Sequence, residues 1–154
     1  MLSQTAEYAM RAMTWLSLTP DQLLPTSELA RHTKIPMHYL AKVLQQLSAA
    51  RLVSGRRGVG GGYRLARPAD KINLTEVIAA VATISRIHTC PLGLPNHGTN
   101  LCPLHRTMDN AIKAVLEIWE GKTLADLLND SKDSKPLCNA ELTAKLTVSA
   151  IGRG

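Results

Sequence analysis

Residues 31–68 hold eight Lys or Arg residues and no Asp or Glu, and the window ends in a glycine-rich run at residues 58–65. A long stretch without acidic residues, with two arginines beside a glycine turn, favours a surface for a polyanion. A basic helix followed by a basic hairpin is typical of a winged helix on DNA. Within the window, four apolar residues at helical spacing predict that one helix face is buried and the other free: Leu40, Val43, Leu44 and Leu47.

The chain ahead of the glycine run predicts a helix-turn-helix. A first helix is expected over residues 3–18, with Ser3 as its N-cap. A short second helix is expected over residues 27–33, capped by Thr26, and a third over residues 36–50. Two helices joined by so short a turn form a helix-turn-helix.

The sequence then becomes strand-like and returns through the glycines, which predicts a small hairpin, the wing, over residues 52–66. The alternative is a merely flexible loop. The predicted fold class is mainly α with a small β-hairpin, a winged helix-turn-helix followed by a long C-terminal dimerisation helix. The DNA-binding region is expected in residues 1–70.

The second half is expected to be a pair of helices around a cysteine loop, in residues 71–130. Asn73 and Glu76 resemble a capping box, and the helix they begin is expected to carry apolar residues as far as Ile87. Residues 131–154 form a polar tail that is expected to be mobile. A long helix is expected over residues 103–120, with Met108, Ile112, Val115, Leu116 and Trp119 on one stripe.

That stripe is wider than its own small domain can cover. The simplest partner is the same helix of a second subunit, which suits DNA-reading helices because these usually act in symmetric pairs. The alternative is that the stripe packs only inside its own subunit.

The DNA-contacting residues are expected on the third helix and in the hairpin. Side chains near the start of a recognition helix reach base edges, whereas Lys and Arg more often hold phosphates. The alternative for each basic residue is a solvated side chain, and Tyr39 has the further alternative of packing against the helix pair. The candidates are Met37, His38, Tyr39, Lys42, Gln45, Arg51, Arg56, Arg57, Tyr63 and Arg64.

The composition, charge and motifs of the chain exclude several classes of protein. A net charge of +6 agrees with a nucleic-acid partner, and no apolar run approaches the roughly 18 residues that span a bilayer. The N-terminus lacks the pattern of a signal peptide, so a cytoplasmic protein is expected. No catalytic triad, phosphate-binding loop or paired-carboxylate motif stands out, and the glycines lie in a hairpin, so an enzyme is not expected.

Three cysteines suit reduced thiols or metal ligands better than a disulfide framework. Cys90 and Cys102 bound a loop that contains His97, and His105 follows at Cys-x-x-His spacing. Thiolates and imidazoles this close can hold zinc or an iron–sulfur cluster. The alternative is two reduced cysteines near a surface loop, with Cys138 a bystander in the tail.

The order of these features resembles the Rrf-two family of bacterial winged-helix regulators. The resemblance covers residues 1–130 and is carried by the motif at residues 5–12, the helix-turn-helix, the wing at residues 57–67 and the cysteine loop. It implies a cytoplasmic homodimer that binds a near-palindromic DNA operator, as a repressor that senses redox state, iron or nitric oxide through an iron–sulfur cluster.

The resemblance also implies a ligand set. Cys90 and Cys102 match the first and last cluster cysteines, His105 matches the histidine that follows, and Glu7 matches an acidic ligand from the partner subunit. The middle cysteine is absent, with His97 in that part of the loop, which favours a [2Fe-2S] cluster on Cys90, Cys102 and two of His105, Glu7 and His97. Glu7 has the alternative of an i,i+4 ion pair with Arg11. For the function of the protein, the alternatives are a zinc-bound or cluster-free regulator that is controlled by thiol chemistry or by a protein partner.

Overall fold

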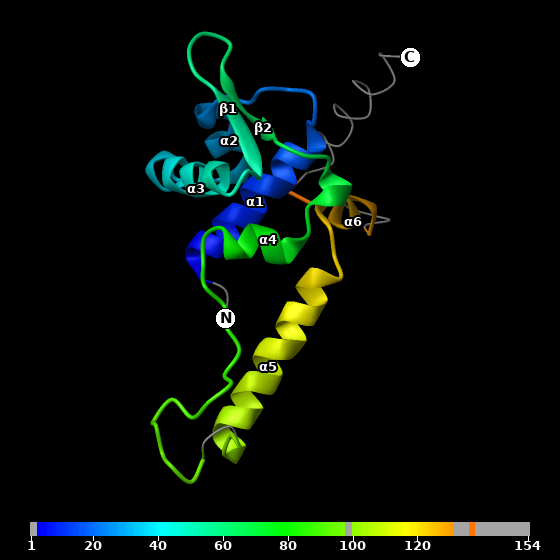
Figure 1. Cartoon of the computed structure of the whole chain (residues 1–154). Helices are drawn as coiled ribbons and strands as arrows, with labels where there is room; N and C mark the ends of the chain where they lie inside the picture. The colour runs from blue at the N-terminus through cyan, green and yellow to red at the C-terminus, as the bar shows by residue number, and fades with distance from the viewer. Residues whose placement is uncertain (1–2, 98–99, 131–135, 138–154) are drawn as a thin grey trace.

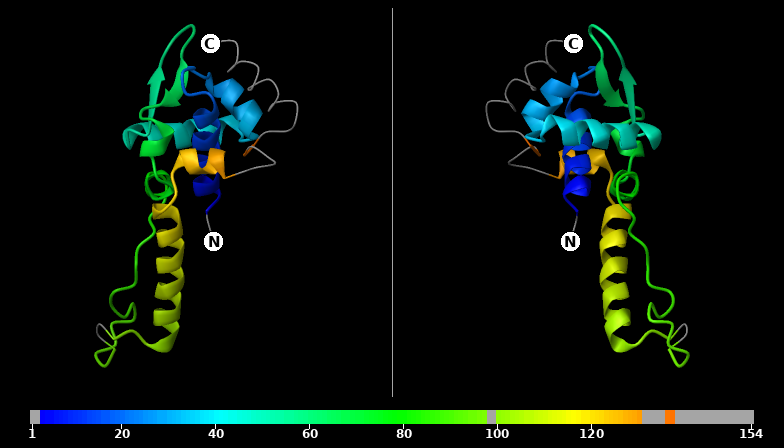
Figure 2. Two further views of the ribbon diagram at one scale, coloured as in Figure 1. Left: turned by 90° about the vertical axis from the view of Figure 1, so that its right-hand side faces the viewer. Right: turned by 90° about the vertical axis from the view of Figure 1, so that its left-hand side faces the viewer.

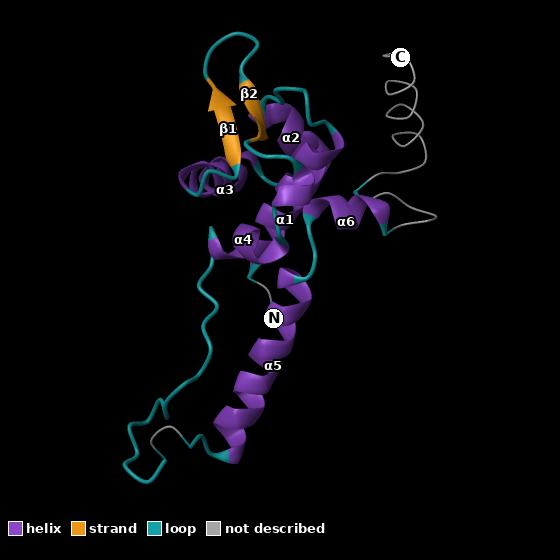
Figure 3. Cartoon of the chain, turned by 45° about the vertical axis from the view of Figure 1, so that its right-hand side comes forward, coloured by secondary structure: helices purple, strands orange, loops and turns teal. Residues whose placement is uncertain are grey.

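The computed structural model describes residues 3–97, 100–130 and 136–137. The expected polar tail lies almost wholly outside the described residues, as does Cys138. Helices and a two-stranded hairpin follow one another along the chain (Figure 1; Figure 3 separates helix from strand). The elements are α1 (Gln4–Leu18), α2 (Thr26–Thr33), α3 (Met37–Ala49), β1 (Val53–Arg56), β2 (Gly62–Leu65), the 3-10 helix η1 (Ala69–Lys71), α4 (Leu74–Ala79), α5 (Pro103–Glu120) and α6 (Leu124–Asn129).

These elements form a head and a projecting helix. The head consists of α1 to α4, the hairpin and α6, and α5 extends away from it (Figures 1 and 2). The chain between α4 and α5 runs beside α5 to the end farthest from the head. The predicted fold class, mainly α with a winged helix-turn-helix and a long C-terminal helix, is confirmed.

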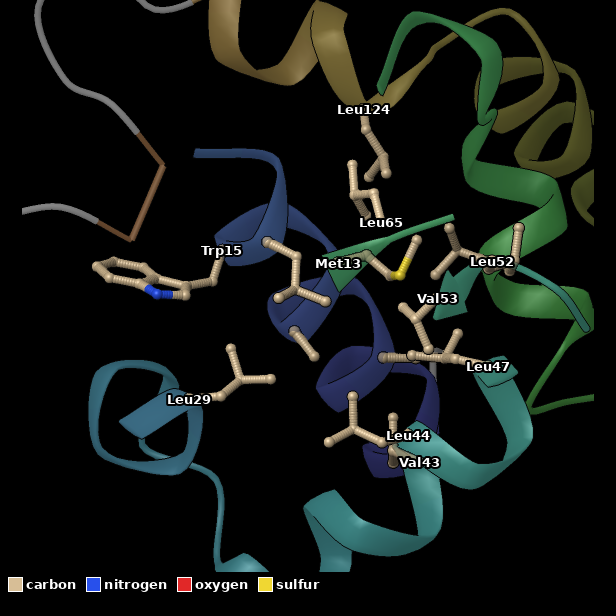
Figure 4. Close-up of a cluster of buried hydrophobic side chains, with 14 of the residues drawn as sticks. Met13, Trp15, Leu29, Val43, Leu44, Leu47, Leu52, Val53, Leu65 and Leu124 are labelled. Atoms are coloured by element: carbon tan, nitrogen blue, oxygen red, sulfur yellow. The ribbon is translucent and has the colours of Figure 1, made fainter. Parts of the chain in front are cut away.

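The core of the head is aliphatic and centres on α1. Met13 and Leu16 are fully buried, and the side chains of α2, α3 and the hairpin gather around Met13 (Figure 4). Ser3 caps α1 as predicted, because its hydroxyl accepts a hydrogen bond from the Ala6 backbone N–H at 3.2 Å.

The helix-turn-helix forms as predicted, with Leu40, Val43, Leu44 and Leu47 at most 1% exposed. Lys34 makes the turn in the left-handed region, at φ 57°. The assignment of Thr26 as the cap of α2 was wrong. Pro25 is the N-cap, and Thr26 is already the first helical residue, because the fixed φ of Pro25, −57°, and its extended ψ bring the chain into the helix one residue earlier.

The hairpin is antiparallel, with register from Val53 opposite Leu65 to Arg56 opposite Gly62. It is fastened to the head by a β-bridge between Leu24 and Tyr63, whose two backbone hydrogen bonds measure 2.8 and 2.9 Å. Gly62 is required at this point because a Cβ there would lie 2.4 Å from the Leu24 carbonyl atoms. The base of the wing, as far out as Gly62, is therefore held against the head by these backbone contacts.

The helix that begins at Asn73 is shorter than predicted. Its capping box with Glu76 is present, but α4 ends at Ala79, and Ile84 and Ile87 lie in an extended segment, residues 82–89. Two causes contribute: β-branched residues from Val81 onward have low helix propensity, and the Ile87 backbone N–H is bonded to a carboxylate of α5.

The C-terminal end of α5 is joined to the head by backbone pairing. Asn73 and Thr123 form a β-bridge, with hydrogen bonds from Leu74 N–H to the Lys122 carbonyl and from Leu124 N–H to the Ile72 carbonyl, both 3.0 Å. None of the helices in the described ranges is long and apolar enough to cross a membrane.

A partly buried histidine makes the stability of the head dependent on pH. The His32 ring stacks on Trp15 with centroids 4.4 Å apart, and burial, followed by the charge of Arg31, lowers the pKa of His32 below its usual 6.5. The unfolded chain therefore takes up this proton at a higher pH than the folded chain, so stability is lost as the pH falls below about 6.5. We expect His32→Gln to flatten the decline in urea-unfolding free energy between about pH 7.5 and 5.5. The exposed His88 is the control: a His88→Gln effect as large as that of His32→Gln would contradict the assignment.

Candidate nucleic-acid interface and cysteine loop

The face of α3 opposite its core residues is open to solvent. Met37 and Tyr39 are 54% and 45% exposed, and the Tyr8 ring of α1 approaches Tyr39 at a tilt, with ring centroids 6.1 Å apart. The Tyr39 ring also lies against His38, at 4.2 Å. Both interpretations of Tyr39 therefore remain open, since it packs on neighbours and still presents half its surface. The exposed candidates on α3 are Met37, His38, Tyr39, Lys42 and Gln45.

The wing and α3 border one groove of about 570 Å³. Its lining includes Arg56 and Arg57 of the wing, Gln45 of α3, and Pro25 and Thr26 at the start of α2. The structure therefore brings together candidates that are up to eighteen residues apart in the sequence, from Gln45 to Tyr63. Arg51 and Arg64 are exposed outside the groove lining; Arg51 occupies a left-handed turn at φ 57° just after α3.

The two arginines that line the groove, Arg56 and Arg57, differ in their local contacts. The Arg56 guanidinium donates a hydrogen bond to the Gly60 carbonyl at 3.0 Å, so this side chain braces the wing turn. No hydrogen bond or ion pair of Arg57 is found within the described part of the chain, and its side chain is exposed. Of the two arginines that line the groove, Arg57 is therefore the one whose charge is freer to meet an external anion.

Tyr63 has an internal contact that the sequence did not reveal. Its ring covers Gly55 on the opposite strand, where an added Cβ would lie 2.9 Å from the ring. Its backbone also forms the bridge to Leu24. An aromatic residue covering a cross-strand glycine stabilises a hairpin, so Tyr63 positions the wing whether or not it touches DNA. Gly55 was the signal available in the sequence, because a glycine inside a strand often marks such a close approach.

The cysteine loop contains two cysteine–histidine pairs. The Cys90 Sγ lies 3.7 Å from His97 Nδ1, and the Cys102 Sγ lies 3.4 Å from His105 Nδ1. Cys90 is buried, and Cys102 is the N-cap of α5. The donors are of the types that zinc and iron–sulfur clusters accept. Within the described residues, however, no group of three or more His, Cys, Asp or Glu side chains is arranged to hold a metal ion.

Glu7 lies on α1 in the head and not beside the cysteine loop of its own chain, which reaches the far end of α5 (Figure 1). Its carboxylate accepts a hydrogen bond from Arg11 Nε at 3.0 Å, and the same guanidinium donates to the Thr33 carbonyl at 2.8 Å. The ion pair considered from the sequence as the alternative for Glu7 is therefore present.

Sequence reasoning missed an ion pair next to the loop. Asp109 of α5 is 8% exposed, and its carboxylate accepts hydrogen bonds from Arg86 Nε and Nη2 at 2.6 and 2.5 Å and from the Ile87 N–H at 2.9 Å. The hydrogen bond from Arg86 is the main cause that lowers the pKa of Asp109 to about 2. An acid among apolar residues on one helix stripe was the only sequence signal for it.

The fold and the exposed basic surface beside α3 define a protein of the winged-helix DNA-binding class. The Rrf2 (Rrf-two) family model, described as an iron-dependent transcriptional regulator, matches residues 2–130. The chain belongs to the Rrf2 family. It is a DNA-binding transcriptional regulator and not an enzyme, and both predictions are confirmed.

Individual relatives agree with this assignment. A predicted HTH-type transcriptional regulator of Aquifex aeolicus (strain VF5) is 31% identical over 130 residues, covering 82% of this chain and 90% of that protein. The solved structure of IscR from T. potens has a TM-score of 0.71 at 21% identity, covering 93% of this chain and 96% of that chain. The solved structure of CymR of B. subtilis, the global cysteine regulator, has a TM-score of 0.71 at 24% identity, covering 86% of this chain and 98% of that chain. At these identities the two structures show the fold.

Proposed function

We propose that the protein is a homodimeric repressor that binds a near-palindromic operator and responds to redox state, iron or nitric oxide through a metal group in the cysteine loop. Residues 1–70 supply the DNA-binding region and residues 71–130 the loop and dimer contacts. The proposed DNA-contacting surface is supported above all by the groove that α3 and the wing share. Gln45, Arg56 and Arg57 all line this concave, basic surface.

The dimer is supported by the bare surface of α5. Of its 18 residues only Asp109 is buried, so the helix has little to stabilise it within one chain. Five of its exposed apolar residues recur at alternating spacings of four and three, the spacing of a seam along which one helix packs against another. They are Leu104, Met108, Ala111, Val115 and Ile118. The neighbouring stripe, Ile112, Leu116 and Trp119, is already half-buried in its own chain.

The loop supplies two cysteines and lacks the third that a three-thiolate cluster site requires, so the proposed group is a [2Fe-2S] cluster held by Cys90, Cys102, His97 and His105. The two cysteine–histidine distances of 3.7 and 3.4 Å support this set, because each imidazole already lies beside a thiol. Glu7 of the partner subunit is the alternative ligand in place of one histidine. Binding the cluster would require Glu7 to give up its ion pair with Arg11. When bound, such a cluster supplies reactivity toward oxidants and nitric oxide; the loop residues bind and orient it.

A second candidate is a cluster-free regulator controlled by the thiols themselves or by a protein partner, with zinc as a further occupant. One observation favours it: the donors within the described residues form two separate pairs and no group of three. CymR, whose structure this chain resembles, is described as a global cysteine regulator and has also been solved in an oxidised form from Staphylococcus aureus.

The operator proposal is tested by selecting bound duplexes from a random DNA library and sequencing them. The expected product is an inverted repeat, bound by two chains per duplex in native mass spectrometry. Recovery of unrelated sequences, or a complex with one chain per duplex, would contradict the proposal.

Arg57→Ala tests the wing contact on the selected operator. We expect affinity to fall by about tenfold and the slope of log affinity against log salt to become shallower by about one unit, because one phosphate contact is lost. Lys71→Ala, which removes a charge from η1 instead of the wing, is the matched control. Unchanged affinity and salt slope for Arg57→Ala would place the wing tip away from DNA.

A further inference from the structure

The segment of residues 82–89 carries the chain from α4 to the cysteine loop without forming a helix or strand. It runs beside α5, away from the head (Figures 1 and 2). Ile84 of this segment and Leu116 and Trp119 of α5 line one small cavity. Among the described residues, the hydrogen bonds between this segment and α5 all end on the carboxylate of Asp109.

Asp109 is well suited to hold the segment in place. Its carboxylate is buried and accepts hydrogen bonds from Nε and Nη2 of Arg86, in a bidentate pair, and from the Ile87 N–H. A planar guanidinium on a carboxylate fixes orientation as well as distance. The contact therefore sets both where the segment lies along α5 and how it is turned.

The position of this contact limits how far apart the two cysteines can lie. Cys90 is three residues after Ile87, a reach of at most about 11 Å. Cys102 is seven helical residues before Asp109, about 10 Å along the axis of α5. Without the contact, the nearest preceding backbone hydrogen bond among the described residues is at the end of α4, from the Ala82 N–H to the Ile78 carbonyl. This end of α4 lies beside the opposite end of α5, a helix about 27 Å long. The Cys90 end would then be free to leave the Cys102 end.

We propose that Arg86 and Asp109 are positioning residues that hold the two cysteine–histidine pairs within reach of each other. Their ion pair fastens the segment of residues 82–89 to α5, which limits how far the Cys90 end of the loop can move from the Cys102 end. The inference builds on the proposed role of the cysteine loop but does not depend on which group occupies it.

The test measures the effective concentration of Cys90 toward Cys102, from the disulfide equilibrium with reduced and oxidised glutathione, in a Cys138→Ser background. Each disulfide formed oxidises the two protein thiols and reduces one oxidised glutathione to two thiols. We expect Asp109→Asn and Arg86→Gln each to lower the effective concentration about tenfold. Asn retains an acceptor for the Ile87 N–H, so Asp109→Asn removes chiefly the guanidinium pair.

A double-mutant cycle separates this role from general destabilisation. If the two residues act as one device, Arg86→Gln combined with Asp109→Asn lowers the effective concentration no further than the more severe single change. Amide exchange is expected to rise in residues 83–90 and to stay unchanged in α3 and the hairpin. The matched control is Lys113→Gln with Glu117→Gln, an exposed i,i+4 pair on the same helix, which is expected to change neither measurement.

Additive effects of the two changes, an equal loss in the control, or no loss in either single variant would overturn the proposal. Arg86→Lys, which keeps the charge but not the bidentate geometry, gives the same comparison if Asp109→Asn does not fold. Failure of the wild-type protein to bind zinc or iron would count against the proposed metal group alone, since the disulfide equilibrium requires no metal.

Discussion

Ile118→Glu is expected to convert the protein to a monomer and to lower its operator affinity by at least about 100-fold. Ile118 is 64% exposed in the single chain, so a charge there costs the isolated protomer little. In a dimer that pairs the exposed seam of α5, the same charge would be buried beside apolar residues, where an unpaired charge is strongly unfavourable. A monomer then binds only one half of the operator with its single head, and the affinity that the second head contributes is lost. Sedimentation velocity and operator titration measure the two effects.

Ala114→Glu is the matched control for this prediction. Ala114 lies on the same helix and is exposed, but it is outside the seam. We expect the Ala114→Glu protein to remain a dimer with nearly unchanged operator affinity. A dimeric Ile118→Glu protein, or an Ala114→Glu protein that is equally monomeric, would show that the seam is not the dimer contact.

Gly62→Ala is expected to detach the wing from the head. The new Cβ would lie 2.4 Å from the Leu24 carbonyl carbon and oxygen and 2.8 Å from the Pro25 nitrogen, all backbone atoms. The backbone at Gly62 also has a positive φ of 154°. Relief requires breaking the Leu24–Tyr63 bridge, so we expect a loss of about 2–4 kcal/mol in unfolding free energy. Operator affinity is expected to fall more than about tenfold in protein that is still folded.

Gly58→Ala separates the steric clash from the backbone strain. Gly58 also has a positive φ, 90°, but an added Cβ there meets nothing within 4 Å. We expect a smaller stability loss of about 1 kcal/mol, the cost of the left-handed conformation alone. Chemical denaturation compares the two variants, and equal losses would mean that the close approach to Leu24 is unimportant.

The head was predictable because its signals are local. The spacing of Leu40 to Leu47 determines which face of α3 is buried, and Ser3 and Asn73 mark helix starts by hydrogen bonds within three residues. The glycines around Gly62 marked the hairpin for the same reason. Thr26 was misassigned by one residue because a proline N-cap and a threonine N-cap give similar sequence patterns.

The parts that were not predicted depend on contacts between distant segments. The early end of α4 and the extended course of residues 82–89 are set partly by Asp109, 22 residues after Ile87. The covering of Gly55 by Tyr63 requires the hairpin register, and the bridge to Leu24 requires the packing of the head. In the cysteine loop, the types of donor could be read from the sequence, whereas their separation into two pairs could not.

The proposed sensing role is tested most directly on protein purified without oxygen, by a visible absorption spectrum together with iron, sulfide and zinc analysis. The account predicts a brown protein with iron and acid-labile sulfide in nearly equal amounts, bleached by oxidant or nitric oxide, and a colourless Cys102→Ser variant that keeps the fold. A colourless wild-type protein that contains zinc or no metal would contradict the cluster proposal. It would leave the DNA-binding regulator in place, with control passing to zinc, to the thiols or to a partner protein.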